Sequence, residues 1–452
     1  MPLRVELRHN EDGAVTETAL PGKRGRRILE WTARDAPAVP REEQQPPWWA
    51  FNPTVFVSSG AWPRYAAELE AALRRAAARQ GAAEAKAREL AAAARDPGAA
   101  IQSIRDFVAR NVREAGPALH ELPRACVTPA DRTLREGYGN TTDRAVLLYA
   151  MLRAAGYAPQ FVLASSAPGV PALRNALETF PAASAFPEAL VRVRDPQAAE
   201  VAYLYLGDTD QYAALGATPH TGRIGLPLPE GRLEVIEPPR DDQSVVDYAL
   251  AIDERGEARL TRKELLFGNA FGREHRRFAE MTPEERRRYF QEMLGAVSQA
   301  AEAEGELRTD FTGYPGLVEF TARVPRYAVR DGEYLYAALP EMLGGFVNLK
   351  SGERRTPLYF GAAARRKVRV RLELPAGFRL EHAPEALPRA AAPALEAAAQ
   401  VSAADGGALA LEAEVAVTPG LVPAARYAEV LKLTQTLAHP RRRTAILRQG
   451  IP

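Results

Sequence analysis

The stretch Gly137–Leu148 reads GYGNTTDRAVLL and continues as YAMLRAAGYAPQFVLASS, and it decides the fold class that we predict for the chain. A glycine turn opens an apolar helix, the helix ends at Gly156, and a strand follows. Asn140, Thr141 and Thr142 all favour a helix start, because their side chains accept hydrogen bonds from N–H groups that the first helical turn leaves unsatisfied. Such a turn can also present a nucleophile, and here Thr141 occupies that position.

Helical segments precede this stretch and strands follow it, which predicts an α+β core. Residues 66–95 are rich in Ala, Glu and Arg and strongly helical by propensity, with a break at Gly81. Residues 99–112 form a second amphipathic pattern. The segments QFVLAS, ALVRVR and VAYLYLG follow as strands, spaced like a sheet that packs on the helix of the opening stretch.

Both ends of the chain are predicted to be β-rich. RRILEW and TVFVSS are strand candidates near the N-terminus, where all four tryptophans lie: Trp31, Trp48, Trp49 and Trp62. These side chains are expected to pack the joint with the next domain, with a ligand-binding aromatic patch as the alternative.

From about residue 240 the pattern alternates, with a hairpin around DERG. A helix then begins with Thr282 as N-cap and Glu285 completing a capping box. These features predict a β-sandwich-like domain with accessory helices. The Ala/Pro-rich segment 383–400 is expected to be a linker or surface loop.

Composition excludes several classes of function. The 452 residues carry 59 Lys and Arg against 57 Asp and Glu, so the concentrated basic stripe of a nucleic-acid binder is absent. No apolar run is long enough for a membrane span. The single cysteine, Cys126, excludes an internal disulfide, and the histidines show no metal-ligand spacing. No phosphate loop or dinucleotide fingerprint is present, so we predict no cofactor and no metal.

The stretch TLREGYGNTTDRAVLLYAMLRAAGYAPQFVLAS resembles the transglutaminase-like superfamily, whose papain-like core begins with a Tyr-Gly-Asp-Cys-Lys-Asp turn. Most of the chain is similar to bacterial proteins in which this core lies between two β-rich modules of unassigned function. The resemblance implies the tail of an N-terminal β-sandwich module in residues 1–62, the core in 63–238 and a C-terminal β-rich module in 239–452. The start of the first module is missing, which suggests truncation or strands supplied by another chain.

The chemistry of this superfamily needs a thiolate, an imidazole that accepts its proton, and a carboxylate that orients the imidazole. Matched position by position, Gly139 is the turn glycine and Asn140 stands for the first Asp. Thr141 stands for the nucleophilic Cys, Thr142 for the Lys and Asp143 for the second Asp.

The other two catalytic positions lie downstream. In FPEALVRV, Glu188 takes the place of the His. In YLGDTDQY, Asp208 is the orienting carboxylate, with Asp210 as the alternative register. The resemblance therefore implies that two of the three functional groups are replaced.

A threonine hydroxyl is a far weaker acid than a thiol, and a glutamate of ordinary pKa is a poor base for it. We therefore expect a catalytically inactive scaffold or binding module, in a bacterial envelope-associated assembly. A protein or peptide partner would bind through the degenerate cleft or the Trp-rich N-terminal segment. The compartment is the periplasm or envelope if an upstream signal has been lost, and otherwise the cytoplasm.

The alternative is a hydrolase or acyltransferase of altered chemistry that uses Thr141, Cys126 or the acid pair Glu188 and Asp208. Cys126 is expected to be a small buried apolar group rather than a nucleophile. His220, twelve residues past Asp208, could enter the cleft but is expected on a surface loop.

Overall fold

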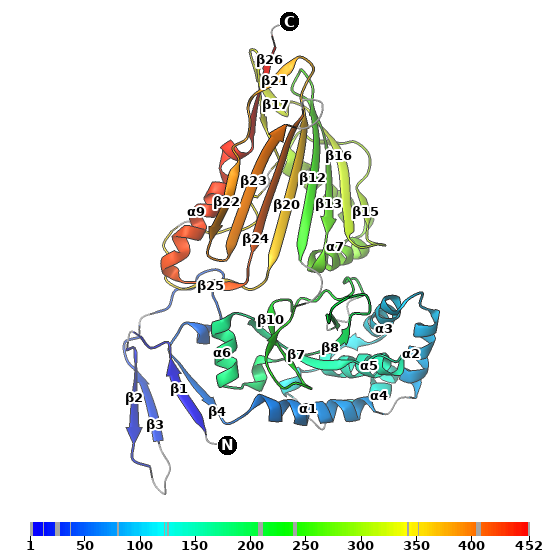
Figure 1. Cartoon of the computed structure of the whole chain (residues 1–452), viewed down its shortest axis with the longest axis vertical. Helices are drawn as coiled ribbons and strands as arrows, with labels where there is room; N and C mark the ends of the chain where they lie inside the picture. Colours follow the sequence, from blue (N-terminus) through cyan, green and yellow to red (C-terminus); the bar gives the residue numbers. More distant parts are fainter. Residues whose placement is uncertain are drawn as a thin grey trace.

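A computed structural model shows three parts arranged around an α+β centre (Figure 1). N-terminal strands, drawn in blue, lie beside a core drawn from blue to green, and a β-rich module drawn from green to red stands on that core. The α+β fold class predicted from the sequence is confirmed. The structure describes residues 3–11, 13–22, 28–36, 38–78, 81–121, 123, 126–206, 211–237, 242–340, 343–350, 352–403 and 408–450.

The N-terminal strands form two antiparallel pairs. β1 (Arg4–Arg8) pairs with β4 (Thr54–Ser58), and β2 (Val15–Leu20) pairs with β3 (Ile28–Ala33). The predicted strands at RRILEW and TVFVSS are confirmed by β3 and β4. No side chain of β2 or β3 is buried, which is typical of an isolated two-stranded sheet without a packing partner.

The four tryptophans divide into two kinds of environment. Trp62 is buried, and its indole Nε1 donates a hydrogen bond of 2.8 Å to the carbonyl of Leu177 in the core. Trp49 packs against the same core. Trp48 is 61% exposed, and Trp31 lies on the β2–β3 pair. The predicted packing at the joint therefore holds for Trp62 and Trp49 and fails for the other two.

In the described part of the core, six helices surround a small sheet. Gly81 separates the first two helices, as predicted, and Gly156, with a φ of +90°, follows the end of α5. The helices are α1 (Trp62–Ala77), α2 (Ala82–Ala93), α3 (Pro97–Asn111), α4 (Ala130–Glu136), α5 (Thr141–Ala154) and α6 (Pro171–Thr179).

The core sheet has the order β11-β10-β7-β8-β9, and all its pairs are antiparallel. One face, including Val191 of β8, packs against α5, and the other face, including Leu190, packs against Ile236. The three strands predicted after the opening stretch are confirmed by β7, β8 and β9. The core strands are β5 (Arg113–Glu114), β6 (Tyr138–Gly139), β7 (Gln160–Pro168), β8 (Glu188–Arg194), β9 (Tyr203–Leu206), β10 (Arg223–Pro227) and β11 (Glu234–Val235).

In the C-terminal module, the described residues form a nine-stranded sheet and a four-stranded sheet that share one apolar core. The large sheet has the order β14-β16-β13-β12-β20-β24-β23-β22, with β15 on β16. Its strands are β12 (Gln243–Ile252), β13 (Ala258–Leu266), β14 (Glu302–Ala303), β15 (Arg308–Asp310), β16 (Gly316–Val324), β20 (Ala364–Glu373), β22 (Leu387–Ala392), β23 (Leu395–Ala403) and β24 (Leu409–Val417).

The smaller sheet closes one end of this module (Figure 1). Together the two sheets confirm that this part of the chain is β-rich with accessory helices, as predicted. The remaining strands are β17 (Ala328–Asp331), β18 (Tyr334–Ala338), β21 (Phe378–His382) and β26 (Thr444–Gln449) in the smaller sheet, and β19 (Leu358–Phe360) paired with β25 (Gly420–Val422) near the core.

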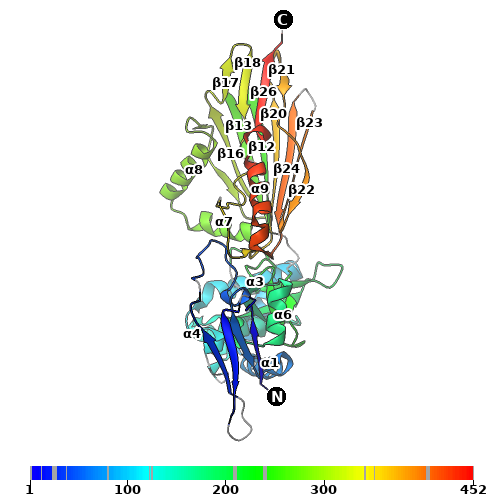
Figure 2. The same cartoon turned by 90° about the vertical axis from the view of Figure 1, so that its left-hand side faces the viewer.

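Three helices accompany the C-terminal strands: α7 (Gly268–Glu280), α8 (Pro283–Val297) and α9 (Tyr427–Ala438). α8 begins at the predicted N-cap Thr282, and the capping box with Glu285 is present. Figure 2 shows α8 standing out to the side of the module, whereas α9 runs along its length. The helices therefore leave the outer face of the large sheet uncovered (Figure 1).

The prediction of a linker at residues 383–400 is wrong. This segment contains β22 and most of β23, which pair as an antiparallel hairpin at the edge of the large sheet. Its alternating alanines are small inward-facing residues, of which Ala397 and Ala399 are buried. The Ala/Pro-rich composition of this segment made it look like a linker, although its side chains alternate with the two-residue period of a strand and every second one faces the core.

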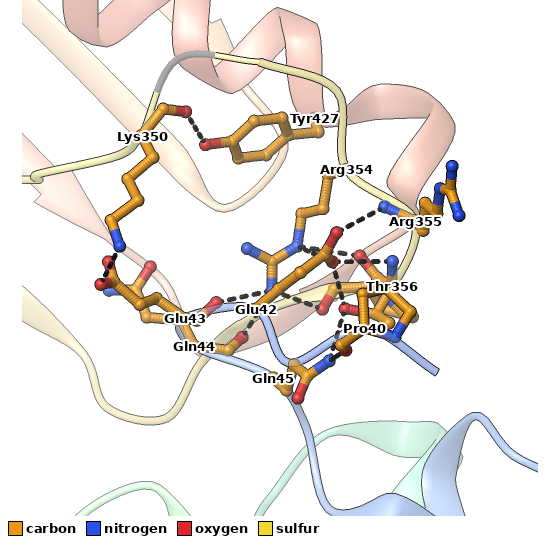
Figure 3. A network of polar contacts seen from close by, with 11 residues as sticks. Pro40, Glu42, Glu43, Gln44, Gln45, Lys350, Arg354, Arg355, Thr356 and Tyr427 are labelled. Atoms are coloured by element: carbon orange, nitrogen blue, oxygen red, sulfur yellow. Dashed lines mark hydrogen bonds and ion pairs between the residues drawn. The ribbon is translucent and has the colours of Figure 1, made fainter. Parts of the chain in front are cut away.

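A segment before the core ties the N-terminal part to the C-terminal module (Figure 3). The carboxylate of Glu42 accepts hydrogen bonds of 2.9 Å from the backbone N–H groups of Arg355 and Thr356, and one from the Thr356 hydroxyl. Arg354 donates to the carbonyls of Glu43 and Gln44. Burial raises the pKa of Glu42, but these hydrogen bonds outweigh it and hold the pKa below its ordinary value.

We expect Glu42→Ala to loosen this joint. Removing the carboxylate leaves the two backbone donors without their acceptor, at a cost of about 1–3 kcal/mol. Limited proteolysis should then cut within residues 38–47 faster than in wild type. Glu43→Ala is the matched control, because Glu43 and Lys350 form an exposed ion pair worth only about 0–1 kcal/mol. Equal cleavage rates for the two variants would contradict this assignment.

Candidate functional site

The opening stretch folds into a tight turn between two helices. α4 ends at Gly137 in the left-handed conformation, with a φ of +70°. Asn140 is the N-cap of α5, and its side-chain oxygen accepts a hydrogen bond of 2.9 Å from the Asp143 N–H. Asp143 Oδ2 accepts from the Asn140 N–H at 3.4 Å, and Oδ1 from the Thr128 N–H at 2.8 Å. The predicted helix capping is therefore confirmed, with Asn140 as the cap.

Gly139 is required by close packing within this turn. A Cβ at this position would lie 2.8 Å from the Cβ of Asp143 and 3.2 Å from Cγ2 of Thr133. Both neighbours are buried and held by hydrogen bonds, so neither can move away easily. The turn glycine is thus explained by sterics alone.

Thr141 is the first residue of α5 and is half-buried. Its hydroxyl forms no hydrogen bond with any described residue. The neighbouring Thr142 is buried, and its Oγ1 also lacks a hydrogen-bond partner within the described residues. The position that the resemblance assigns to the nucleophile therefore holds a hydroxyl to which no base among the described residues is hydrogen-bonded.

Glu188 is the first residue of β8 and pairs across the sheet with Ala164 of β7. Ala164 and Leu190 belong to the apolar cluster on the side of the sheet away from α5. Because strand residues alternate between the two faces, Glu188 shares that face. Its side chain is 40% exposed. Within the described residues no hydrogen bond or ion pair joins Glu188 to Thr141.

His220 is the partner of Glu188, and the expectation that it lies on a surface loop is wrong. The residue is 3% exposed, and its Nε2 lies 2.9 Å from Oε2 of Glu188. The segment before β10 is folded back by local hydrogen bonds: the Thr221 hydroxyl donates to the Thr218 carbonyl, and the Arg223 N–H donates to the His220 carbonyl. This turn places the imidazole beside Glu188.

The second ring nitrogen of His220 also has a neighbour. Nη1 of Arg223 lies 3.5 Å from Nδ1. Since a guanidinium only donates, Nδ1 is the accepting atom of this contact, while Nε2 faces the carboxylate of Glu188. The close polar contact with His220 lowers the pKa of Glu188, burial opposes this, and the positive charge of Arg223 lowers it further. Glu188 is therefore a carboxylate held in its ionised form.

The remaining predicted site residues are not brought into this arrangement. Asp208 and Asp210 lie outside the described residues. Cys126, expected to be buried, is exposed. Within the described part of the chain, no group of three or more His, Cys, Asp or Glu side chains is placed to hold a metal ion, and no helix there is long and apolar enough to span a membrane.

Sequence reasoning missed a second polar cluster on the same face of the sheet. Arg192 is buried and donates hydrogen bonds of 2.8 Å to Glu230 and Glu234. The hydroxyl of Tyr205 donates to Glu234 at 3.0 Å, and the ring of Tyr203 lies 4.2 Å from the guanidinium. The available signal was the arginine inside the apolar strand ALVRVR, two positions from Leu190 on the Glu188 face.

Comparisons with known proteins agree with the fold of the core. Residues 84–198 match the family model of the transglutaminase-like superfamily. The core of the chain is transglutaminase-like. No curated protein sequence gives a significant match. A crystal structure from Parabacteroides distasonis, described as a "putative protease", shares the fold with a TM-score of 0.60 and 17% identity, covering 99% of this chain and 70% of that one.

The transglutaminase-like turn depends on Gly139 having no side chain. We expect Gly139→Ala to destabilise the core by about 1–3 kcal/mol, because the added methyl group forces Asp143 or Thr133 to shift. Chemical denaturation followed by tryptophan fluorescence measures this. Gly313→Ala is the control, since a Cβ there meets no atom within 4 Å and its φ is not positive. A change of less than about 0.5 kcal/mol for Gly139→Ala would refute the steric role.

The lowered pKa of Glu188 predicts a pH-dependent contribution to stability. A carboxyl group whose pKa is lower in the folded chain stabilises the fold above its unfolded value, near 4.5, and this contribution is lost as pH falls through the folded value. Glu188→Gln should therefore reduce the drop in melting temperature between about pH 7 and pH 3. The effect is expected to be small, because solvent screens a half-exposed carboxylate.

His220→Phe serves as the companion variant, since it removes the hydrogen bond that lowers the Glu188 pKa. Its pH profile should approach that of Glu188→Gln. If neither variant differs from wild type in the acid range, the Glu188–His220 pair does not contribute to folding stability.

Proposed function

We propose that this chain is a catalytically inactive transglutaminase-like protein that serves as a scaffold or binding module. The observation that carries the proposal is the Glu188–His220 pair. The imidazole is buried, one ring nitrogen lies on Glu188, and the other faces Arg223. Neither nitrogen is available as a base for a nucleophile at Thr141.

The chemistry at Thr141 supports the same conclusion. A helix N-terminus lowers the pKa of a cysteine thiol into the range where the thiolate forms near neutral pH. A threonine hydroxyl starts many units higher, so it needs a base that removes its proton during attack. Thr141 has no such group hydrogen-bonded to it within the described residues, and Glu188 is held as a carboxylate of low basicity.

The alternative, a hydrolase or acyltransferase of altered chemistry, would use a Thr–His–Glu arrangement. A Ser–His–Asp triad needs the acid on one ring nitrogen and the nucleophile on the other. Here Glu188 has the role of the acid, but Arg223 occupies the side where the nucleophile would lie. Thr141 begins the helix α5, which packs on one face of the sheet, whereas the side chain of Glu188 lies on the other face.

A binding role would need only the architecture of the superfamily, and this chain has the elements of that architecture. The turn around Gly139, the buried helix α5 and the sheet that follows are all retained. In this proposal the parts 1–62, 63–238 and 239–452 act as one scaffold. A protein or peptide would dock at the degenerate cleft or at the N-terminal segment that carries Trp48, and the setting would be a bacterial envelope assembly.

The decisive experiment is an activity assay with a matched gain-of-thiol control. Purified protein should not hydrolyse or transfer acyl groups from amide and thioester substrates, and Thr141→Ala should leave the background rate unchanged. Turnover above background that Thr141→Ala abolishes would overturn the proposal in favour of the alternative enzyme.

The control variant restores the missing thiol. Because Cys126 is exposed, it is first replaced by Ser so that it does not react. Thr141→Cys in that background should then be alkylated by iodoacetamide with a thiol pKa below the ordinary value of about 8.5. Adding Glu188→His supplies an imidazole at the family position. If the variant with Thr141→Cys alone reacts with iodoacetamide but does not turn over substrate, the result supports a helix N-terminus that still activates a thiol but has no catalytic base beside it.

A further inference from the structure

A cavity of about 570 Å³ lies in the C-terminal module, between the large sheet and the helices α7 and α8. Its volume falls within the range of about 300–1,000 Å³ that small-molecule sites occupy. β12, β13, β16 and β20 form its floor, with side chains such as Tyr248, Val318 and Phe320. Nothing in the transglutaminase-like core contributes to it.

The floor of this cavity interrupts an otherwise apolar sheet face. Inward positions of β13 alternate as Ala258, Leu260, Arg262, Glu264 and Leu266, so two charged side chains replace aliphatic ones. On β20, Arg366 precedes the buried residues 368, 370 and 372 on the same face. Charged groups on the inner face of a sheet cost desolvation free energy, so their presence calls for a partner.

Arg262 is only partly satisfied by its neighbours. Its Nε donates to the Tyr248 hydroxyl at 3.3 Å, and its Nη2 donates to Glu264 at 2.8 Å. Its Nη1 is buried and has no hydrogen-bond partner within the described residues. The side chain is 13% exposed, so bulk water reaches it poorly.

Arg366 is the stronger indication. Its side chain forms no hydrogen bond or ion pair with any described residue, and its Nε is buried without a partner. The arginines next to it on the outer face behave differently: Arg365 pairs with Glu414, and Arg369 pairs with Asp247. The chain therefore provides carboxylates for the exposed arginines and leaves the inward one without any.

The charges that line the cavity leave a positive excess. Arg262, Arg273, Arg366 and Arg443 line it, against only two carboxylates. Those two are already paired, Glu264 with Arg262 and Glu274 with Arg273. An anion that entered would therefore meet uncompensated guanidinium groups.

The rest of the wall is apolar and lies on α7, α8, β16 and the chain after β18. Its aromatic and aliphatic members are Phe278, Met293, Val297, Val318, Phe320 and Leu339. We propose that this cavity binds a small organic carboxylate with an apolar body, whose head group lies on Arg366 and on Nη1 of Arg262. Arginine holds a planar carboxylate through two parallel N–H···O bonds, which matches the donors left over here.

This site is independent of the proposed loss of catalysis in the core. Binding here neither requires nor excludes activity at Thr141, because no residue of the cavity belongs to the core. A failure of one proposal therefore leaves the other standing.

The test is isothermal titration calorimetry of the full chain with octanoate, decanoate and 4-phenylbutyrate. At least one should bind saturably at a single site and raise the melting temperature, as a ligand specific to the folded state does. Decanol, which lacks the carboxylate, and inorganic phosphate, which lacks the apolar body, should each bind at least about tenfold more weakly than the best carboxylate.

Arg366→Met keeps most of the side-chain volume and removes the charge, and it should weaken carboxylate binding by about tenfold or more. Arg369→Met is the matched control on the same strand, with its side chain on the outer face, and should bind like wild type. Circular dichroism verifies that both variants are folded; if Arg366→Met does not fold, the comparison of decanoate with decanol on the wild-type chain decides.

Three outcomes overturn the proposal. The first is no saturable binding of any of the three carboxylates below about 1 mM. The second is equal affinity for decanoate and decanol, which would mean an apolar pocket that ignores charge. The third is equal loss of affinity in the Arg366 and Arg369 variants, which would place the ligand elsewhere.

Discussion

The extensive burial of α5 is the constraint on which the core depends. Ten of its 14 residues are buried, from Thr142 near its start to Leu152 near its end. A helix enclosed in this way cannot leave the N–H groups of its first turn to water, so protein atoms must accept their hydrogen bonds. Asn140 and Asp143 do so reciprocally, and Asp143 also fixes the preceding loop through the Thr128 N–H. The turn at Gly139 has its shape because these acceptors must reach the helix.

The residues that shape this turn are distinct from the residues that carry out the chemistry of a thiol enzyme. The glycine, the cap and the aspartate at the end of the turn serve folding, and they are all present. The thiol and the imidazole of such an enzyme serve only catalysis, and the resemblance assigns their positions to Thr141 and Glu188. In the inactive protein that we propose, the outline of the site persists without its reacting groups because the packing of a central helix maintains that outline.

Much of the fold could be predicted from the sequence, because local patterns determined it. The capping box at Thr282, the hairpin at Gly256 and the breaks at Gly81 and Gly156 all follow from side chains within a few residues. The errors lay where long-range contacts decide. His220 meets Glu188 from 32 positions away in sequence, and no local pattern indicates that pairing.

The hairpin at residues 387–403 was missed for a different reason. Its alanines fit a linker by composition, and only the neighbouring strand β24 makes them part of a core. The inward position of Arg366 could not be predicted for a similar reason. Arginines occur at both inward and outward positions of β20, and the sequence alone does not distinguish the two until the sheet has formed. The turn at the start of α5 could therefore be predicted from the sequence, whereas the pairing of Glu188 with His220 could not.

The joint at Glu42 also has a consequence for how the chain is made. Glu42 and Thr356 are separated by 314 positions, and Gln45 and Thr356 by 311. At ribosomal rates of about 5–20 residues per second, the N-terminal segment is exposed for about 15–60 s before its partner emerges. The core, whose contacts lie within one shorter stretch, can fold during that interval. The joint can therefore close only after Thr356 has been synthesised, long after the residues around Glu42.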